Sequence, residues 1–338
     1  MIELAKGPDR RRQELFRETS RKMAVHEAII EKDFWVCLIL RIIFSSERWG
    51  DKVVFKGGTS LSKVYGAIER FSEDIDLILD WRELGYSKDD PWLPESKNKK
   101  DQFVKATTPI TRQFLNDVFT PSLQELCDSE LGSLLNIRAD EDIVKVEYPR
   151  AFDNPSILPY IILELGPLAA WTPHKDAVIT PYAAEQYPGV FTTSECHLKV
   201  VTIERTFWEK ATILHQEYHR PDDKPMPPRY SRHYYDVFKM ARASIADSAI
   251  KHIDILPRVV EFKERFYKAT WSSLASARPG SFRLVPPSAR IPDLERDYQA
   301  MGSMFFHAEP SFDIVLESLG SLESRINTVH AQDKDSAP

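Results

Sequence analysis

The sequence predicts an α/β fold, in which a mixed sheet flanked by helices is followed by a helical C-terminal domain. Three observations support it: a strand–turn–helix–strand pattern over residues 53–79, an apolar strand over 159–165, and helical periodicity in the C-terminal part. The 338 residues are enough for two domains or one large one. We expect a first domain over residues 1–192, a second over 193–330, and a flexible tail over 331–338.

The N-terminal part of the first domain is predicted to form two helices. The second, over residues 25–44, has apolar residues at helical spacing and should pack behind the sheet. Its most apolar stretch, residues 34–44, is short and contains Arg41, which favours a buried helix over a membrane span. The N-terminus is too polar for a secretory signal.

Residues 53–79 are the most informative part of the chain. Val53–Lys56 is predicted to be a strand that ends in the pair Gly57 and Gly58. A helix over about residues 60–68 should follow, and then a strand over residues 75–79. Glycine permits backbone conformations closed to other residues and allows a phosphate to approach the chain. The pattern is not a Walker A loop, because no Gly-Lys-Ser/Thr follows.

Two acids, Asp74 and Asp76, open the second strand of this pattern. Side chains at i and i+2 of a strand share a face, so both carboxylates should point to one place beside the glycine turn. Such a pair suits Mg²⁺, which usually takes one or two carboxylates together with substrate phosphates. Thr59 and Ser60 offer hydroxyl groups at the start of the helix. A Gly-Gly pair or an Asp-x-Asp pair alone is weak evidence for such a site, but their ordered combination predicts a site for a metal ion and a nucleotide.

These residues resemble the nucleotidyltransferase superfamily built on a DNA polymerase β-like palm. More closely, they resemble the AbiEii/AbiGii toxins of type IV toxin–antitoxin and abortive-infection systems. The matching blocks are FKGGTSLSK at 55–63, RFSEDIDLIL at 70–79, ERTFWEKATILH at 204–215 and RHYYDVFKM at 232–240. The resemblance implies a palm followed by a helical domain. It also implies transfer of nucleotides from a nucleoside triphosphate to an RNA acceptor, the tRNA 3′ end, which would block translation.

The resemblance also implies a set of site residues. Asp74 and Asp76 would bind Mg²⁺ and act in catalysis with Lys210 and Asp236. The residues expected to contact the nucleotide are Lys56, Gly57, Gly58, Thr59, Ser60 and Ser72. Lys210 would offset charge that develops on the triphosphate. Asp236 would either orient Lys210 or accept a proton from the attacking hydroxyl, and the sequence leaves both roles open.

The remainder of the first domain offers one further candidate ligand. Residues 80–102 are charged and proline-containing, and they are either a solvated insertion or a contact for RNA or an antitoxin. A helix over residues 105–126 with a break at Pro121 and a strand over residues 145–152 should follow. Glu164, in the strand over residues 159–165, is either a third metal ligand or a strand-edge glutamate in water or paired with arginine.

The second domain is predicted to be helical throughout. A proline-rich loop should follow its first helix. The expected helices cover residues 200–219, 230–246, 255–272, 294–301 and 311–329. If Lys210 did not lie in the matching block ERTFWEK, its side chain would be expected to reach solvent. For His233, we expect either an interhelix hydrogen bond, which we favour, or a contact to nucleotide or RNA.

Composition limits the other functional classes. Cys37, Cys127 and Cys196 lie too far apart for a disulfide framework or a zinc spacing, so we expect a cytoplasmic protein. The net charge of −6 disfavours a general nucleic-acid binder but permits a local basic patch. Expected partners are a nucleoside triphosphate, tRNA and a winged-helix antitoxin. Two alternatives are transfer of a nucleotide to a protein hydroxyl, and nucleotide binding without catalysis.

Overall fold

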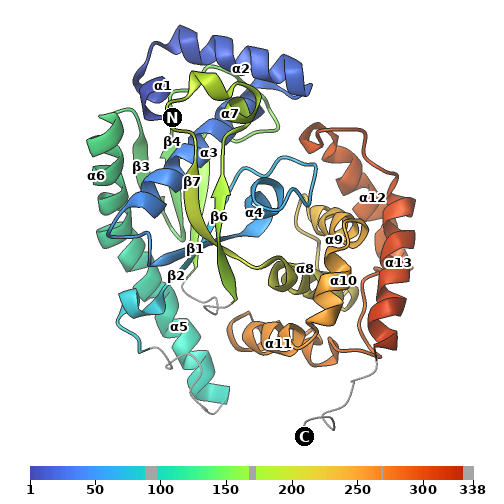
Figure 1. The fold of residues 1–338 in the computed structure, drawn as a ribbon. Coiled ribbons are helices and arrows are strands. Elements are labelled where there is room, and N and C mark those ends of the chain that lie inside the picture. The colour runs from blue at the N-terminus through green and yellow to red at the C-terminus, as the bar shows by residue number, and fades with distance from the viewer. Residues whose placement is uncertain (88–96, 167–172, 268, 330–338) are drawn as a thin grey trace, which may run out of the picture. The chain divides into compact units, whose positions relative to one another are not determined.

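The computed structural model describes residues 1–87, 97–166, 173–267 and 269–329 of the chain (Figure 1). The chain divides into two compact units. The first unit comprises Met1–Gly66 and Arg70–Val201, and the second comprises Ala67–Glu69 and the chain from Thr202 onward. The chain therefore passes from the first unit to the second after Val201, at the end of the strand Cys196–Val201.

A seven-stranded mixed sheet forms the first unit (Figure 1), in the strand order β3-β4-β5-β2-β1-β7-β6. The strands are β1 (Val53–Lys56), β2 (Ile75–Leu79), β3 (Asn136–Asp140), β4 (Ile143–Glu147), β5 (Ile161–Gly166), β6 (His174–Ile179) and β7 (Cys196–Val201). The pairs β1–β7 and β2–β5 are parallel, and the other neighbours are antiparallel. The expected mixed sheet with flanking helices is confirmed.

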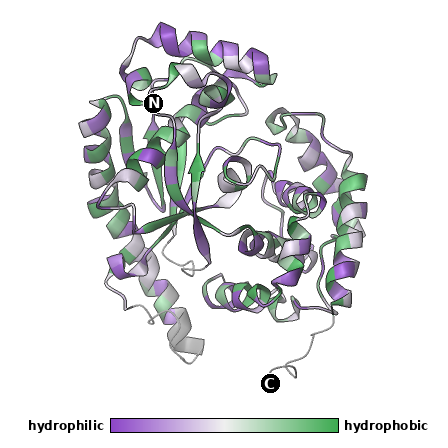
Figure 2. Cartoon of the chain, in the orientation of Figure 1, coloured by the Kyte–Doolittle hydropathy of each residue, from purple (hydrophilic) through white to green (hydrophobic). Residues whose placement is uncertain are grey.

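Among the helices of the first unit, α3 is almost completely buried. The helices are α1 (Ile2–Lys6), α2 (Asp9–Met23), α3 (Glu27–Ser45), α4 (Gly57–Lys63), α5 (Lys97–Phe114), α6 (Thr120–Leu131) and α7 (Tyr182–Gln186). Every residue of α3 from 28 to 40 is buried, and the helix contacts β7, α2, α6 and α7. By contrast, α2 is largely hydrophilic in Figure 2. Helix α3 is therefore a buried helix that packs against the sheet, as the apolar stretch predicts.

The long helix expected over residues 105–126 is wrong in its bounds and in the position of its break. Helix α5 begins at Lys97, a π-helical turn follows at Leu115–Phe119, and α6 continues from Thr120. Pro121 is the second residue of α6, directly after the π-helical turn, whose backbone stays helical through Phe119 and Thr120. The irregular turn therefore precedes the proline.

Three strands, β3, β6 and β7, were not predicted from the sequence. β3 pairs with β4 as a hairpin, and the strand expected over residues 145–152 is β4, which ends at Glu147. β6 is mostly exposed and polar, so it lacks an apolar signal. β7 has alternating burial, but it lies directly before a helix, and the two merged into one expected helix over residues 200–219.

Helices form the second unit. They are α8 (Ile203–Tyr218), α9 (Arg232–Arg242), α10 (Ile245–Lys251), α11 (Ile255–Phe266), α12 (Ile291–Ala300) and α13 (Phe312–Thr328). The helix expected over residues 230–246 is two helices, because Ser244 adopts a left-handed conformation between α9 and α10. Hydrophobic and hydrophilic residues alternate along α13 (Figure 2), and the helix contacts α9. Its buried residues are Phe312, Val315, Leu319, Leu322 and Ile326, which lie at helical spacing.

Two expectations fall on residues that the structure does not describe. Residues 88–96 of the charged segment over 80–102, and the expected tail from residue 331, lie outside the described ranges. In the described part of that segment Trp81 is buried, so its beginning is packed against the unit rather than solvated. Within the described ranges, no helix has the length and apolar character that a membrane crossing requires.

Candidate active site

The turn between β1 and α4 requires glycine for two reasons. Gly57 has a φ of +84°, in the left-handed region that side chains disfavour. A Cβ atom on Gly57 would also lie only 1.8 Å from Oδ2 of Asp76. The Asp76 carboxylate therefore lies directly against the backbone of the turn, as expected from the sequence.

Helix α4 begins earlier and ends earlier than the helix predicted over residues 60–68. It starts at Gly57 and ends at Lys63. The Thr59 hydroxyl donates to the backbone oxygen of Asp74 at 2.6 Å, and the Ser60 hydroxyl donates to that of Gly57 at 2.8 Å. Both side chains are buried. The Thr59 hydroxyl fastens the turn to the segment that carries the acids, whereas the Ser60 hydroxyl holds the turn itself.

Two more side chains lie over the second glycine. A Cβ atom on Gly58 would lie 2.6 Å from the Ser72 Oγ and 3.2 Å from Nη2 of Arg70. The Arg70 side chain is buried, and its Nη1 donates to the Phe71 carbonyl at 3.1 Å. The structure thus brings Ser72 to the glycine turn and adds a guanidinium group beside it.

The acids and Lys56 lie across three neighbouring strands. Asp76 is in register with Lys56 on β1 and with Glu164 on β5, so these side chains share a face of the sheet. Asp74 precedes the first residue of β2 by one position. Glu164 is exposed, whereas Asp74 and Asp76 are half-buried.

The environment of Asp74 suits a bound cation. Burial, together with the nearby carboxylates of Glu73 and Asp76, raises the pKa of Asp74 to about 7. Its Oδ1 atom is buried and has no hydrogen-bond partner among the described residues. An unpaired buried oxygen is costly, and a divalent cation would satisfy it.

Asp74 and Asp76 therefore fit the two-carboxylate set that Mg²⁺ takes when phosphates complete its coordination. In the described part of the chain, no group of three His, Cys, Asp or Glu side chains is placed to hold a metal ion. A third-ligand role for Glu164 therefore stays a prediction.

Sequence reasoning missed a set of charged residues in α3. Asp33 is buried; its Oδ1 lies 3.0 Å from the Lys63 Nζ, and its Oδ2 accepts from the Tyr182 N–H at 2.6 Å. Burial raises the pKa of Asp33 to about 6, although the ammonium of Lys63 opposes the shift. Because Lys63 is the last residue of α4, this pair anchors the far end of the glycine-turn helix. Three consecutive charges, Glu31 to Asp33, inside an apolar helix were the available signal.

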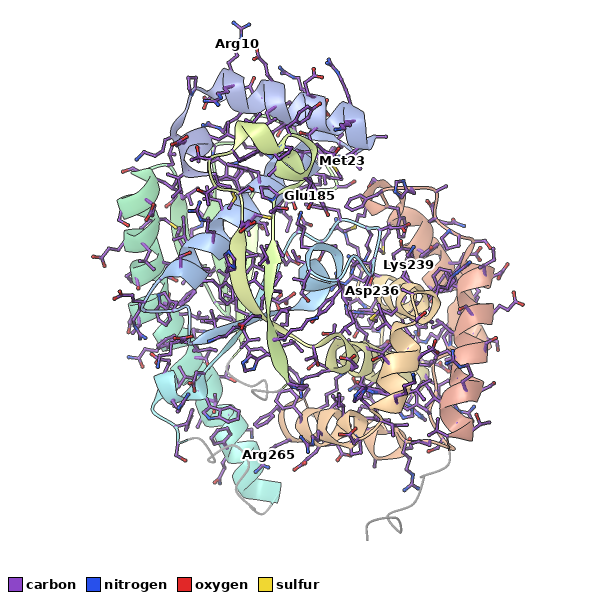
Figure 3. The ribbon with its side chains drawn as sticks, in the orientation of Figure 1. Arg10, Met23, Glu185, Asp236, Lys239 and Arg265 are labelled. Atoms are coloured by element: carbon purple, nitrogen blue, oxygen red, sulfur yellow. The ribbon has the colours of Figure 1, made fainter. Side chains whose placement is uncertain are left out.

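The second unit brings together the other two predicted catalytic residues. The Lys210 Nζ on α8 lies 2.9 Å from Oδ2 of Asp236 on α9, and Asp236 is fully buried. Figure 3 labels Asp236 and Lys239 on α9. The Lys210 Nζ is also 3.3 Å from the His233 Nδ1, which gives the interhelix hydrogen bond expected for His233.

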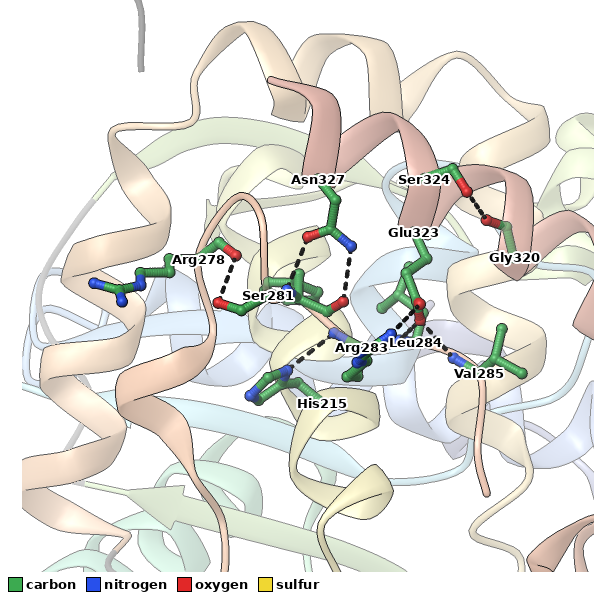
Figure 4. Close-up of polar contacts among 11 residues, drawn as sticks. His215, Arg278, Ser281, Arg283, Leu284, Val285, Gly320, Glu323, Ser324 and Asn327 are labelled. Atoms are coloured by element: carbon green, nitrogen blue, oxygen red, sulfur yellow. Dashed lines mark hydrogen bonds and ion pairs between the residues drawn. The ribbon is translucent and has the colours of Figure 1, made fainter. Parts of the chain in front are cut away.

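The far side of α8 is fastened to α13 through a loop (Figure 4). The His215 Nδ1 accepts from the Arg283 N–H at 3.0 Å, and Glu323 accepts from the Leu284 N–H at 2.6 Å. Asn327 pairs with both backbone groups of Phe282, at 2.8 and 3.0 Å. Burial lowers the pKa of His215 to about 4, so its ring is neutral and structural.

Comparisons with known proteins agree with this architecture. Residues 38–318 match the model of the nucleotidyl transferase AbiEii toxin family of type IV toxin–antitoxin systems. The fold is similar to MenT4, a nucleotidyltransferase toxin from Mycobacterium tuberculosis H37Rv. The TM-score is 0.51 at 15% identity, over 94% of this chain and 90% of that one.

A nucleotidyltransferase structure from H. pylori gives a TM-score of 0.40 at 13% identity, over 89% of this chain and 95% of that one. No curated protein sequence gives a significant match. The family match spans most of the chain, so the chain belongs to the AbiEii family of nucleotidyltransferase toxins of type IV toxin–antitoxin systems.

Proposed function

We propose that the protein is a Mg²⁺-dependent enzyme that transfers nucleotides from a nucleoside triphosphate to the 3′ end of tRNA and so blocks translation. The observation that carries the proposal is the contact between the Asp76 carboxylate and the Gly57 backbone, next to the unpartnered Oδ1 of Asp74. In this arrangement a cation on the two aspartates would lie beside the glycine turn, where phosphates would approach the backbone.

The residues of the first unit would bind and orient the triphosphate. The backbone of Gly57 and Gly58 would receive the phosphates, with the Arg70 guanidinium and the Ser72 hydroxyl beside them. Asp74 and Asp76 would hold Mg²⁺, which when bound neutralises phosphate charge and aligns an in-line displacement.

The residues of the second unit would act as a fixed positive charge. The ion pair at 2.9 Å keeps the Lys210 ammonium in one orientation, because the buried carboxylate of Asp236 has no access to solvent. We therefore assign Asp236 the orienting role and Lys210 the role of offsetting charge on the triphosphate. These roles need Asp236 to remain ionised throughout the reaction.

The partners follow from the toxin assignment. An antitoxin belongs to every toxin–antitoxin system, and we propose a winged-helix protein for this one. We propose action in the cytoplasm, since Cys37, Cys127 and Cys196 are free and buried and form no disulfide.

Labelled nucleoside triphosphates, total tRNA and Mg²⁺ test the proposal directly. We expect wild type to label tRNA, Asp74→Ala and Asp76→Ala to abolish labelling, and toxicity on expression to disappear with it. Asp142→Ala is the matched control, because Asp142 is an exposed acid of the same unit in an ion pair with Arg112. Label on protein would indicate protein nucleotidylation, and nucleotide binding without transfer would indicate a non-catalytic module; either result contradicts the proposal.

A further inference from the structure

A buried ammonium group connects the two chain segments that lead into the acid-bearing strands. Lys32 on α3 is fully buried, and its Nζ lies 2.6 Å from the Glu73 Oε2 and 3.1 Å from the Leu158 carbonyl oxygen. The same Glu73 oxygen accepts from the Leu158 N–H at 3.1 Å. Lys32, Glu73 and Leu158 are termed the buried bridge below.

The buried bridge lies where both strands begin. Glu73 immediately precedes Asp74, and Leu158 lies shortly before β5, which carries Glu164. β2 and β5 are parallel neighbours, with Asp76 in register with Glu164, so their starting ends lie at the same edge of the sheet. One ammonium group therefore fixes the positions from which both strands extend.

Stability alone does not account for such a pair. Well-packed apolar side chains of similar volume usually stabilise a core as well as a buried ion pair does. The buried bridge instead fixes geometry, because three hydrogen bonds hold Glu73 and Leu158 in one arrangement. Groups that orient metal ligands in this way affect metal affinity without touching the ion.

We propose that Lys32 and Glu73 are positioning residues that hold Asp74 and the start of β5 in the arrangement that binds a Mg²⁺–nucleoside triphosphate. This inference rests on the proposed function, because it concerns the same carboxylates. Neither residue is assigned contact with the metal or the nucleotide.

The double variant Lys32→Met/Glu73→Met tests the proposal, since it removes the bridge without leaving an unpaired buried charge. Binding of the α,β-methylene analogues of the four nucleoside triphosphates is measured against Mg²⁺ concentration. We expect the Mg²⁺ concentration at half-saturation to rise about tenfold. Lys32→Met/Glu73→Gln restores an acceptor for the Leu158 N–H and a donor for its carbonyl, and should return the requirement to within about threefold of wild type.

Glu31→Gln is the matched control on the same helix. Glu31 is equally buried and accepts from the Ala151 N–H at 2.9 Å and the Phe152 N–H at 3.2 Å, but it contacts neither Glu73 nor Leu158 in these bonds. This variant should keep the wild-type Mg²⁺ requirement. The inference is overturned if the Mg²⁺ concentration at half-saturation is unchanged in Lys32→Met/Glu73→Met. It is also overturned if that concentration rises equally in Glu31→Gln.

Amide hydrogen exchange provides a second readout that needs no variant. In wild type, Mg²⁺ with a bound analogue should slow exchange of the Leu158 amide about tenfold or more, because ligand binding fixes both strands. An unchanged rate overturns the inference even if the bridge-free variant fails to fold. A wild type that binds the analogue with Mg²⁺ but transfers no nucleotide contradicts the proposed function alone, and one that binds no analogue contradicts both.

Discussion

The substitution Gly57→Ala is the sharpest perturbation of the candidate site, because one methyl group meets the Asp76 carboxylate. The added Cβ would lie 1.8 Å from the Asp76 Oδ2, whereas separations below 3.0 Å require a shift. The carboxylate must therefore move by at least about 1.2 Å, the difference between those two distances (3.0 − 1.8). The backbone of residue 57 needs to move less than the Asp76 carboxylate, since its φ is already +84° in the wild type.

The two consequences differ in size. Placing alanine in the left-handed region costs about 1–2 kcal/mol of stability. That loss lowers the midpoint of thermal unfolding by roughly 2–8 °C. Misplacement of a reacting or ligating group by about 1 Å can cost about 100-fold in rate. We therefore expect nucleotide transfer to fall about 100-fold in a protein that is still folded.

Gly85→Ala is the matched control for this experiment. Gly85 has nearly the same φ, +85°, but a Cβ there would have no neighbour within 4 Å among the described residues. Gly57→Ala should lose at least as much stability in thermal unfolding as Gly85→Ala, and only Gly57→Ala should lose transfer of labelled nucleotide. Equal transfer by the two variants would refute the claim that Asp76 acts from its position against the turn.

Three further predictions address the second unit and the metal. Lys210→Met should lower the free energy of unfolding by about 3–5 kcal/mol, because it removes the ammonium group that pairs with the buried Asp236 carboxylate. Lys210→Met/Asp236→Asn should regain most of that stability in urea denaturation but not nucleotide transfer; recovered transfer would remove Lys210 from the mechanism. Burial lowers the folded-state pKa of His215 to about 4 from 6.5. The contribution of neutral His215 to the free energy of unfolding is therefore complete above pH 6.5 and is lost as the pH falls to 4. The loss should be at most about 3 kcal/mol in denaturation across pH, and His215→Gln should lack it; parallel profiles would contradict this assignment. Chelation with EDTA should abolish nucleotide transfer and added Mg²⁺ should restore it, and persistent transfer in EDTA would exclude the cation from the reaction.

The parts of the fold that depend on neighbouring residues could be predicted from the sequence. The bounds of β1 and β2 are as predicted, because each is a short apolar run beside a glycine turn or an acid pair. The contact between the turn and Asp76 also follows from local order, since the two strands are adjacent and antiparallel. The pairing of Lys210 with Asp236 was suggested by a resemblance to a family, and spacing alone would have left Lys210 in solvent.

The rest depends on partners that are distant in the chain. Lys32 pairs with Glu73, 41 positions away, and with Leu158, 126 positions away, and neither relation leaves a periodic signal. β6 is an edge strand and mostly exposed, so its sequence shows no apolar alternation. Tertiary contacts, rather than local propensity, decide these features.

The most direct measurement is the anomalous scattering of Mn²⁺ in crystals grown with an α,β-methylene nucleoside triphosphate. We predict a peak within about 2.5 Å of carboxylate oxygens of both Asp74 and Asp76, with the phosphates against Gly57 and Gly58. The same crystals of the Asp74→Ala variant should lack the peak. A Mn²⁺ ion or triphosphate bound away from the two aspartates, or an unchanged peak in the variant, would contradict the central claim.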